Sequence, residues 1–230
     1  MANPEITALR WIGHACYVLT SPGGANVLID PLPADMGYPV SDIPAIDLVL
    51  VSHEHLDHNN VGLAPGHPKV VRGSSARGWH PGELSVEDVE LRVIAGAYHD
   101  DSQGAERGRT AIFSLQTGGF KLLHLGDLGH QLDTNLIAQC GGHDVVCIPI
   151  GGHFTIDAEV ARDVVNTLRP SIVIPMHYRT DRLRPDFPIS GLDESGFLTD
   201  AEVDRAETPS IELSAAALPA AQRILVLKTP

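Results

Sequence analysis

The chain is poor in cysteine. Its 230 residues include only 3 Cys, at positions 16, 140 and 147, and none of them forms a Cys-x-x-Cys pair. An odd, scattered set of this kind excludes a disulfide framework and favours reduced, buried thiols. Cys16 and Cys147 lie within apolar runs, so we expect them to be inert core residues.

Basic residues are also scarce. The chain has 16 Lys and Arg against 29 Asp and Glu, a formal net charge of −13 with His counted as neutral. A broad nucleic-acid-binding surface needs clustered Lys and Arg, so we expect no nucleic-acid partner. Bound divalent cations would offset part of this negative charge.

Long hydrophobic runs are missing as well. Apolar runs such as residues 145–150 are far too short to cross a bilayer. Residues 1–5 lack the basic stretch, followed by an apolar one, that is typical of a secretory signal. We therefore expect a cytoplasmic protein with no membrane partner.

Short apolar runs separated by turn residues predict one layered domain spanning residues 1–230. We predict strands at 6–12, 16–19, 26–29, 47–52, 70–71, 89–97, 110–116, 120–125, 145–150, 171–175 and 223–228. The apolar spacing over 157–168 predicts a helix, with Thr155 or Asp157 as its cap. Residues 182–219 are rich in Pro, Asp, Glu and Ala, which indicates loop plus a short helix, with a lid as one interpretation.

Histidine is abundant, with 12 residues, and four ligand-type side chains fall within six positions: His53, His55, Asp57 and His58. They follow directly on the strand predicted at 47–52. Residues two apart in an extended segment point the same way, so His53 and His55 can share one metal ion while Asp57 and His58 reach a second. Imidazole and carboxylate ligands suit zinc and similar divalent metals. The density of ligands disfavours the alternative of a polar surface loop.

Three more ligand-type residues each follow an apolar run. We predict His99 as the third imidazole of the first metal, Asp127 as a bridge between both ions, and His177 as the residue that completes the second site. Each ligand stands where a strand is expected to stop. This recurrence predicts that the ligands gather at one edge of the sheets.

This pattern resembles that of the metallo-β-lactamase superfamily, whose signature is His-x-His-x-Asp-His followed by His, Asp and His. The chain is most similar to the bacterial branch of small metal-dependent hydrolases that resemble ascorbate-6-phosphate lactonase. The segments that carry the resemblance are 11–14, 30–31, 52–58, 98–100, 124–130, 149–157 and 175–178. The resemblance implies an α/β fold, the αββα sandwich of two mixed β-sheets flanked by helices, with two metal ions at one edge. It does not specify a substrate, because relatives cleave lactams, lactones, thioesters and phosphodiesters.

Two adjacent cations predict a hydrolase in which a metal-bridging hydroxide attacks a carbonyl or phosphoryl centre. The pKa of such a water falls to about 7 in comparable zinc sites. Asp57 is expected to orient this nucleophile while it binds metal, and Asp30 or backbone carbonyls to fix the imidazole tautomers. We expect a small anionic ester, lactone or phosphodiester as substrate. Zinc is favoured, manganese, iron and nickel are compatible, and homo-oligomerisation is left open.

Glu54 separates hydrolysis from a redox alternative. An acidic residue in the second ligand position marks the diiron redox branch of the same scaffold. Here that position holds His55 and Glu54 only precedes it, so we interpret Glu54 as a non-ligand. A diiron redox enzyme and a non-catalytic, metal-stabilised binding protein remain as alternatives.

The other histidines have weaker signals. His130 follows Asp127 by three residues and is assigned a catalytic role, as proton donor or substrate contact, with structural capping as an equal alternative. A place at the edge of the site is favoured for His14 over one in the core, and His153 is either close to the pocket or in an exposed loop. We interpret His124 as structural, and three more as ordinary loop residues: His67, His80 and His143.

Two arginines lie in the loop before the strand at 110–116. Arg107 and Arg109 could meet an anionic substrate, but solvated surface positions are favoured for both.

Overall fold

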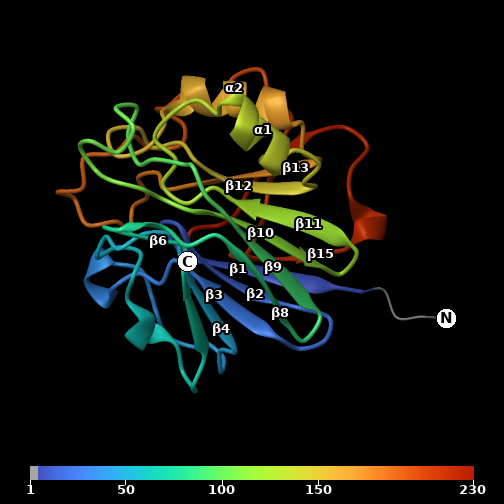
Figure 1. The fold of residues 1–230 in the computed structure, drawn as a ribbon. Helices are drawn as coiled ribbons and strands as arrows, with labels where there is room; N and C mark the ends of the chain where they lie inside the picture. Colours follow the sequence, from blue (N-terminus) through green and yellow to red (C-terminus); the bar gives the residue numbers. More distant parts are fainter. Residues whose placement is uncertain (1–4) are drawn as a thin grey trace.

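The structure, a computed structural model, describes residues 5–230. Two β-sheets face each other, and helices α1 (Thr134–Cys140) and α2 (Ala158–Leu168) lie outside the second sheet (Figure 1). The first sheet has the strand order β15-β1-β2-β3-β4-β5, and the second has the order β14-β16-β13-β12-β11-β10-β9-β8. The predicted α/β sandwich of two sheets is confirmed.

The strands of the first sheet are β1 (Thr7–Gly13), β2 (Cys16–Thr20), β3 (Asn26–Ile29), β4 (Leu48–Val51), β5 (Lys69–Arg72) and β15 (Ser210–Leu213). Those of the second are β8 (Gly82–Val86), β9 (Val89–Ile94), β10 (Ile112–Thr117), β11 (Phe120–His124), β12 (Val145–Pro149), β13 (Ile172–Met176), β14 (Val203–Arg205) and β16 (Arg223–Val226). A separate ribbon joins β6 (Ser74–Ser75) to β7 (Gly78–Trp79). Both large sheets are mixed, with antiparallel pairs at one end and parallel pairs at the other.

Alternation along the strands of the first sheet separates its two faces. In β4, Leu48 and Leu50 point into the apolar core shared with the second sheet, while Val49 and Val51 belong to a smaller apolar cluster on the other side. This is the two-residue period of a strand buried on both faces. One apolar cluster therefore includes residues of both sheets, which supports the prediction of a single domain.

Loops rather than a helix cover the outer face of the first sheet. Met36, the last residue of the 3₁₀ turn η1 (Ala34–Met36), and the nearby Tyr38 pack there with Leu183 and Ile189. The helical layer of the predicted sandwich thus consists of α-helices beside the second sheet and of short 3₁₀ turns beside the first. Pro, Gly and Asp are frequent in residues 32–46 and 182–191, and these residues favour turns over helix.

Helix α2 begins and ends as its sequence predicts. The Asp157 side chain accepts a hydrogen bond from the backbone N–H of Val160 at 3.0 Å, so Asp157, not Thr155, is the cap. The helix buries Ala161, Val164 and Leu168 on one side. Helix α1 was not predicted from the sequence, although Asp133 caps it in the same way.

The long segment 182–219 contains more strand than expected. It includes β14, β15 and the 3₁₀ turn η3 (Ala215–Ala217), which is the short helix of the prediction. Another 3₁₀ turn, η2 (Val61–Leu63), follows the His53–His58 segment. The remaining predicted strands are confirmed within a few residues at their ends.

All three cysteines are buried and free, as predicted. Burial raises the pKa of Cys16 to about 12, so its thiol stays protonated and unreactive. No helix among residues 5–230 has the length and apolar character needed to cross a membrane. Apart from Glu5, the N-terminal residues from which no secretory signal is expected lie outside the described part of the chain.

Candidate metal centre

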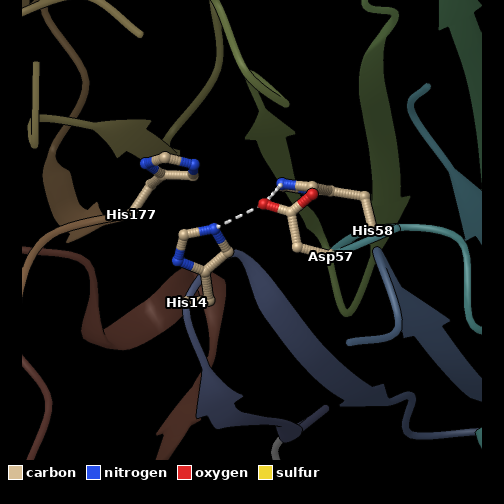
Figure 2. A group of neighbouring side chains, drawn as sticks. All are labelled: His14, Asp57, His58 and His177. Atoms are coloured by element: carbon tan, nitrogen blue, oxygen red, sulfur yellow. Dashed lines mark hydrogen bonds and ion pairs between the residues drawn. The ribbon is translucent and has the colours of Figure 1, made fainter. Parts of the chain in front are cut away.

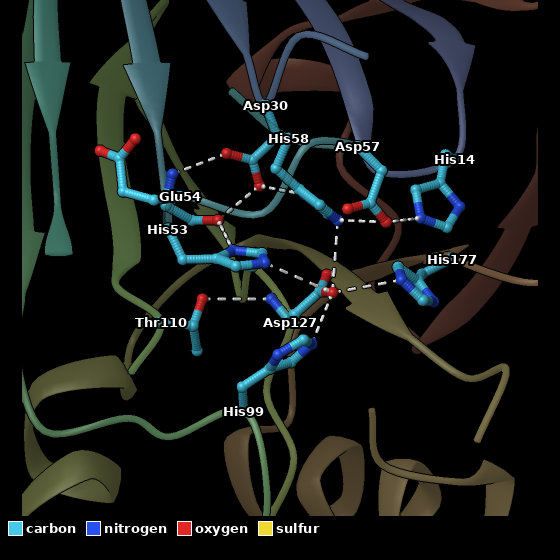
Figure 3. A network of polar contacts seen from close by, with 12 residues as sticks. His14, Asp30, His53, Glu54, Asp57, His58, His99, Thr110, Asp127 and His177 are labelled. Atoms are coloured by element: carbon cyan, nitrogen blue, oxygen red, sulfur yellow. Dashed lines mark hydrogen bonds and ion pairs between the residues drawn. The ribbon is translucent and has the colours of Figure 1, made fainter. Parts of the chain in front are cut away.

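The seven predicted ligands lie together where β4, β9, β11 and β13 end, and Figure 3 labels all of them except His55. Donor atoms of His53, His55 and His99 lie within 4.8 Å of one another, and we call this group the first site. Donor atoms of Asp57, His58 and His177 are equally close, and we call this group the second site. These two groups contain the residues assigned to each ion from the sequence, and a third group joins His53, His58 and Asp127; the assignment of ligands stays a prediction.

Asp127 lies between the two sites. Its Oδ2 is 2.8 Å from Nε2 of His99 in the first site. The same oxygen is 3.2 Å from Nε2 of His177 and 3.3 Å from Nε2 of His58 in the second. A carboxylate approached from both sides can bridge two cations, as the position of Asp127 after its strand predicts.

Two glycines allow the ligand loops to approach closely. A Cβ atom on Gly129 would lie 2.3 Å from the carbonyl carbon of His99, and one on Gly151 would lie 2.2 Å from the carbonyl oxygen of His177. Any side chain at either position would displace a ligand's backbone. Glycine at these two positions therefore permits the present placement of His99 and His177.

Asp30 orients two of the imidazoles from outside the site. Its Oδ2 lies 3.2 Å from Nδ1 of His58 and accepts a hydrogen bond from the Ser52 hydroxyl at 2.7 Å. Because that hydroxyl donates to Asp30, it accepts from Nδ1–H of His53, 2.9 Å away. These contacts favour a proton on Nδ1 of both rings, so that Nε2 is the nitrogen each ring would offer to a metal. The expected role of Asp30 as partner of a ligand imidazole agrees with these contacts.

The donor set fits divalent cations. Within residues 5–230, several buried polar atoms of the site have no hydrogen-bond partner: Nε2 of His53, Nε2 of His58, Nδ1 of His99, Oδ1 of Asp127 and both ring nitrogens of His177. Buried polar groups are normally hydrogen-bonded, so such a concentration of exceptions needs an explanation. Nitrogen and oxygen lone pairs that converge in this way are explained by metal ligation.

Electrostatics in the site also favour metal binding. Burial lowers the pKa of His53 well below its ordinary value, and the neighbouring His58 adds to the effect. Burial lowers the pKa of His55 as well. Metal ligands must be neutral imidazoles, so these shifts keep both residues in their binding form.

The carboxylates of Asp127 and Asp57 are ionised, and the imidazole of His58 balances part of their negative charge. Burial opposes the charge on Asp127, but His177 and His58 outweigh it and hold the pKa of Asp127 well below its usual range. Burial likewise opposes the charge on Asp57, yet His58 and His14 keep its pKa low. For His58, burial lowers the pKa, but Asp127 and Asp57 reverse this and raise it well above the ordinary value.

His14 lies inside this centre, closer than the predicted position at its edge. It occupies the turn between β1 and β2 and is fully buried. Its Nε2 is 3.3 Å from Oδ2 of Asp57, and its ring lies beside that of His177, with 3.8 Å between centroids and 40° between the ring planes (Figure 2). Burial, together with the nearby His177, lowers the pKa of His14 to about 4.

A cavity of about 270 Å³ opens above the metal centre. It is lined by His55, Asp57, His99, Asp127, Arg107, Phe154 and Phe187. Phe154 and Phe187 form an aromatic wall, with 5.3 Å between ring centroids. Phe187 comes from the segment 182–219, so one part of that segment borders the site as the lid interpretation requires.

Hydrogen bonds to Asp100 hold the loop that carries Arg107. The Asp100 carboxylate accepts hydrogen bonds from the backbone N–H groups of Gly104 and Arg107, at 2.8 and 2.7 Å. The Arg107 guanidinium lies 5.7 Å from the centre of the Phe154 ring. Arg107 therefore borders the cavity, which differs from the solvated surface position that the sequence favours. Arg109 does not share this position and lies over Trp79.

Glu54 points away from the centre, as predicted for a non-ligand (Figure 3). Its exposed carboxylate forms an ion pair with Arg72 at 2.7 Å. The second ligand position is thus occupied by His55.

His130 is not one of the described residues that line the cavity. Its Nε2 accepts a hydrogen bond from the backbone N–H of Tyr98 at 3.0 Å, and its Nδ1 lies 2.7 Å from the carbonyl oxygen of Gln131. These partners favour the structural alternative, and the catalytic role of His130 stays a prediction.

The remaining histidines divide between surface and core. His153 is exposed and packs beside Phe154. His124 is buried and structural, as predicted, and contacts the carbonyl oxygen of Ala15 at 2.9 Å. His143 was predicted to be an ordinary loop residue but is buried, between Ser114 and the carbonyl of Cys140.

Comparison with known proteins identifies relatives over most of the chain. The model of the family described as "Beta-lactamase superfamily domain" matches residues 8–177. A UPF0173 metal-dependent hydrolase from Anaeromyxobacter dehalogenans is 32% identical over 206 residues, covering 76% of this chain and 75% of the relative.

Solved structures extend the comparison. A protein of the metallo-beta-lactamase superfamily from Thermotoga maritima, assigned as a Zn-dependent hydrolase, aligns with a TM-score of 0.73 and 28% identity, covering 96% of this chain and 98% of that one. A diiron beta-hydroxylase from Streptomyces venezuelae aligns with a TM-score of 0.56 and 17% identity, covering 76% of this chain and 45% of its own length. The latter likeness shows the fold alone. The resemblance to ascorbate-6-phosphate lactonase stays a prediction.

Proposed function

The chain belongs to the metallo-beta-lactamase superfamily as a metal-dependent hydrolase, and we propose that its substrate is a small anionic ester, lactone or phosphodiester. The observation that carries this proposal is the arrangement of donors beneath the cavity. His55, His99, Asp57 and Asp127 face the same space as Arg107 and two aromatic rings. A substrate in the cavity would therefore contact both the metal centre and the groups that can recognise it.

We assign two divalent cations to the centre, one held by His53, His55 and His99 and one by Asp57, His58 and His177, with Asp127 between them. The nitrogen and oxygen donors favour zinc, and manganese, iron and nickel are compatible. When bound, such cations supply a water of lowered pKa and polarise the oxygen of the attacked group.

Asp57 is the residue of this chain best placed to guide the attack. Its side chain is 20% exposed, and it lines the cavity although it belongs to the second site. Its carboxylate stays ionised because its pKa is held low against the effect of burial. An ionised carboxylate accepts a hydrogen bond from an attacking water and so fixes the direction of its lone pair.

The walls of the cavity support the substrate class. Phe154 and Phe187 offer apolar surface, and the Arg107 guanidinium beside them offers charge-assisted hydrogen bonds to a carboxylate or phosphate. A volume of about 270 Å³ limits the substrate to a small molecule. A cytoplasmic location without nucleic-acid or membrane partners is part of the same proposal.

The pairing of Glu54 with Arg72 supports hydrolysis over the diiron redox alternative, because it leaves His55 in the second ligand position. The open cavity above the centre supports an enzyme over a binding protein.

The test is turnover by metal-reconstituted protein. Purified protein loaded with zinc or manganese is screened against chromogenic carboxylate esters, lactones and phosphodiesters, beside a His55→Ala control. We expect turnover of at least one class that the control lacks. Equal rates for both proteins across all classes would contradict the proposal.

A further inference from the structure

His14 differs from the buried structural histidines, and resembles the predicted ligands, because a nitrogen of its ring lacks a partner among the described residues. Both ring nitrogens of His124 and of His143 have hydrogen-bond partners on the protein. Among the described residues, Nδ1 of His14 has none. Its Nε2 has only the carboxylate of Asp57 at 3.3 Å, which is long for a charge-assisted hydrogen bond. A purely structural role therefore leaves this buried imidazole poorly satisfied.

The backbone holds His14 in place at a conformational cost. Its φ angle is +54°, in the left-handed region that residues other than glycine seldom adopt. Its carbonyl oxygen accepts hydrogen bonds from the indole N–H of Trp11 at 3.0 Å and from the backbone N–H of His177 at 3.2 Å. Strained backbone that is held in this way is found at functional sites.

The ring of His14 points into the second site. One donor atom from each of His14, Asp57, His58 and His177 lies within 4.8 Å of the others (Figure 2). His58 and His177 are fully buried like His14, whereas His55 and His99 of the first site line the cavity. Three residues of the second site are thus fully buried and Asp57 connects it to the cavity, whereas the first site presents two imidazoles to the cavity.

We propose that His14 is an additional protein ligand of the second metal, and that this extra imidazole closes the second site so that it holds its ion more tightly than the first. The inference rests on the proposed metal centre. It follows the general difference between closed metal sites, which are filled by protein donors, and catalytic sites, which keep a position open. The first site would then lose its ion first when metal is limiting.

The experiment measures metal binding directly. Apo protein prepared with a chelator is titrated with Zn²⁺ against a competing chromophoric chelator, and separately with Co²⁺ while its visible d–d absorption is recorded. Wild type is compared with His14→Ala, with His14→Gln as a second variant that keeps most of the side-chain volume. His143→Ala, which removes a buried imidazole bound to Ser114 and Cys140, is the matched control. Circular dichroism confirms that each variant is folded.

We expect wild type to bind two ions, one more tightly than the other. His14→Ala should weaken the tighter one by about 100-fold, at the upper end of the loss caused by removing a partner outside the ligand shell. The Co²⁺ spectrum of the fully loaded variant should change, while His143→Ala behaves as wild type. Unchanged affinities in folded His14→Ala and His14→Gln would overturn the inference. So would a lower affinity with an unchanged Co²⁺ spectrum, which would show that His14 only positions Asp57. A wild-type protein that binds no divalent metal would instead overturn the proposed function itself.

Discussion

The carboxylate of Asp30 lies 3.2 Å from Nδ1 of His58, on a ring whose Nε2 faces Asp127. The same carboxylate reaches His53 through the hydroxyl of Ser52. One buried acid thus orients an imidazole in each metal site. Loss of this acid should therefore affect both sites together.

We predict that Asp30→Asn weakens metal binding at both sites by about 10- to 100-fold, the usual effect of losing a partner of a ligand imidazole. The amide keeps the size of the side chain but replaces one acceptor oxygen with a donor. Competition with a chromophoric chelator measures the change. Wild-type affinity in the variant would show that the tautomers of His53 and His58 do not depend on Asp30.

Metal binding should release a proton at neutral pH. The pKa of His58 in the metal-free protein is raised above its ordinary value by Asp127 and Asp57, in spite of burial, so the ring is still charged at pH 7. A metal on its Nε2 displaces about one proton, and affinity falls as pH drops below the raised pKa. Calorimetry in buffers of different ionisation enthalpy counts the protons. A binding enthalpy independent of the buffer would contradict the prediction.

Removal of metal should lower thermal stability. An ion present at 100 times its Kd stabilises the fold by about 2.7 kcal/mol. In a chain of this length that corresponds to about 5–10 °C in melting temperature. Melting curves with excess zinc and with EDTA measure the difference. Coincident curves would show that the centre binds no metal under those conditions.

Arg107→Ala should lower kcat/KM for an anionic substrate by about 10- to 100-fold, because a hydrogen bond to a charged group contributes about 1.5–3 kcal/mol. A neutral analogue of the same substrate should lose much less. Arg109→Ala is the matched control, since Arg109 lies over Trp79 rather than beside the cavity. Equal losses for charged and neutral substrates would rule out a charge-recognising role for Arg107.

His130→Gln separates the two roles left open for His130. A general acid or base contributes about 10²- to 10⁴-fold to the rate, so a catalytic His130 would show a loss of that size in kcat. A residue that fastens Tyr98 and Gln131 would instead lower the melting temperature and leave kcat within a few-fold. The backbone partners of both ring nitrogens favour the second result.

The residues of the candidate metal centre could be predicted because each follows a recognisable strand. Apolar runs before His53 and His177 form buried strands, and the ends of such strands meet at one edge. The part played by His14 could not be predicted in the same way. Its neighbour Asp57 is 43 residues away, and only the arrangement of β1 beside the other strands brings the two together.

The elements that the sequence did not predict escaped prediction for different physical reasons. Strand β14 is Val-Asp-Arg and largely exposed, so it shows no apolar alternation. Helix α1 has only seven residues, too few for a helical period to stand out. The loops that cover the first sheet depend on packing between residues 32–46 and 183–189, which no local pattern encodes.

The candidate ligands follow several different strands, which links the metal centre to the stability of the whole fold. His99 and Asp127 are 28 residues apart in sequence, and His14 and Asp57 are 43 apart, yet each pair meets at the centre. Ions held there join distant segments of a polypeptide whose three cysteines are all free. Because the ions bind the folded arrangement and not the unfolded chain, their binding free energy adds to the stability of the fold. The metal centre would thereby connect distant segments of the fold reversibly, in a protein whose three cysteines form no disulfide.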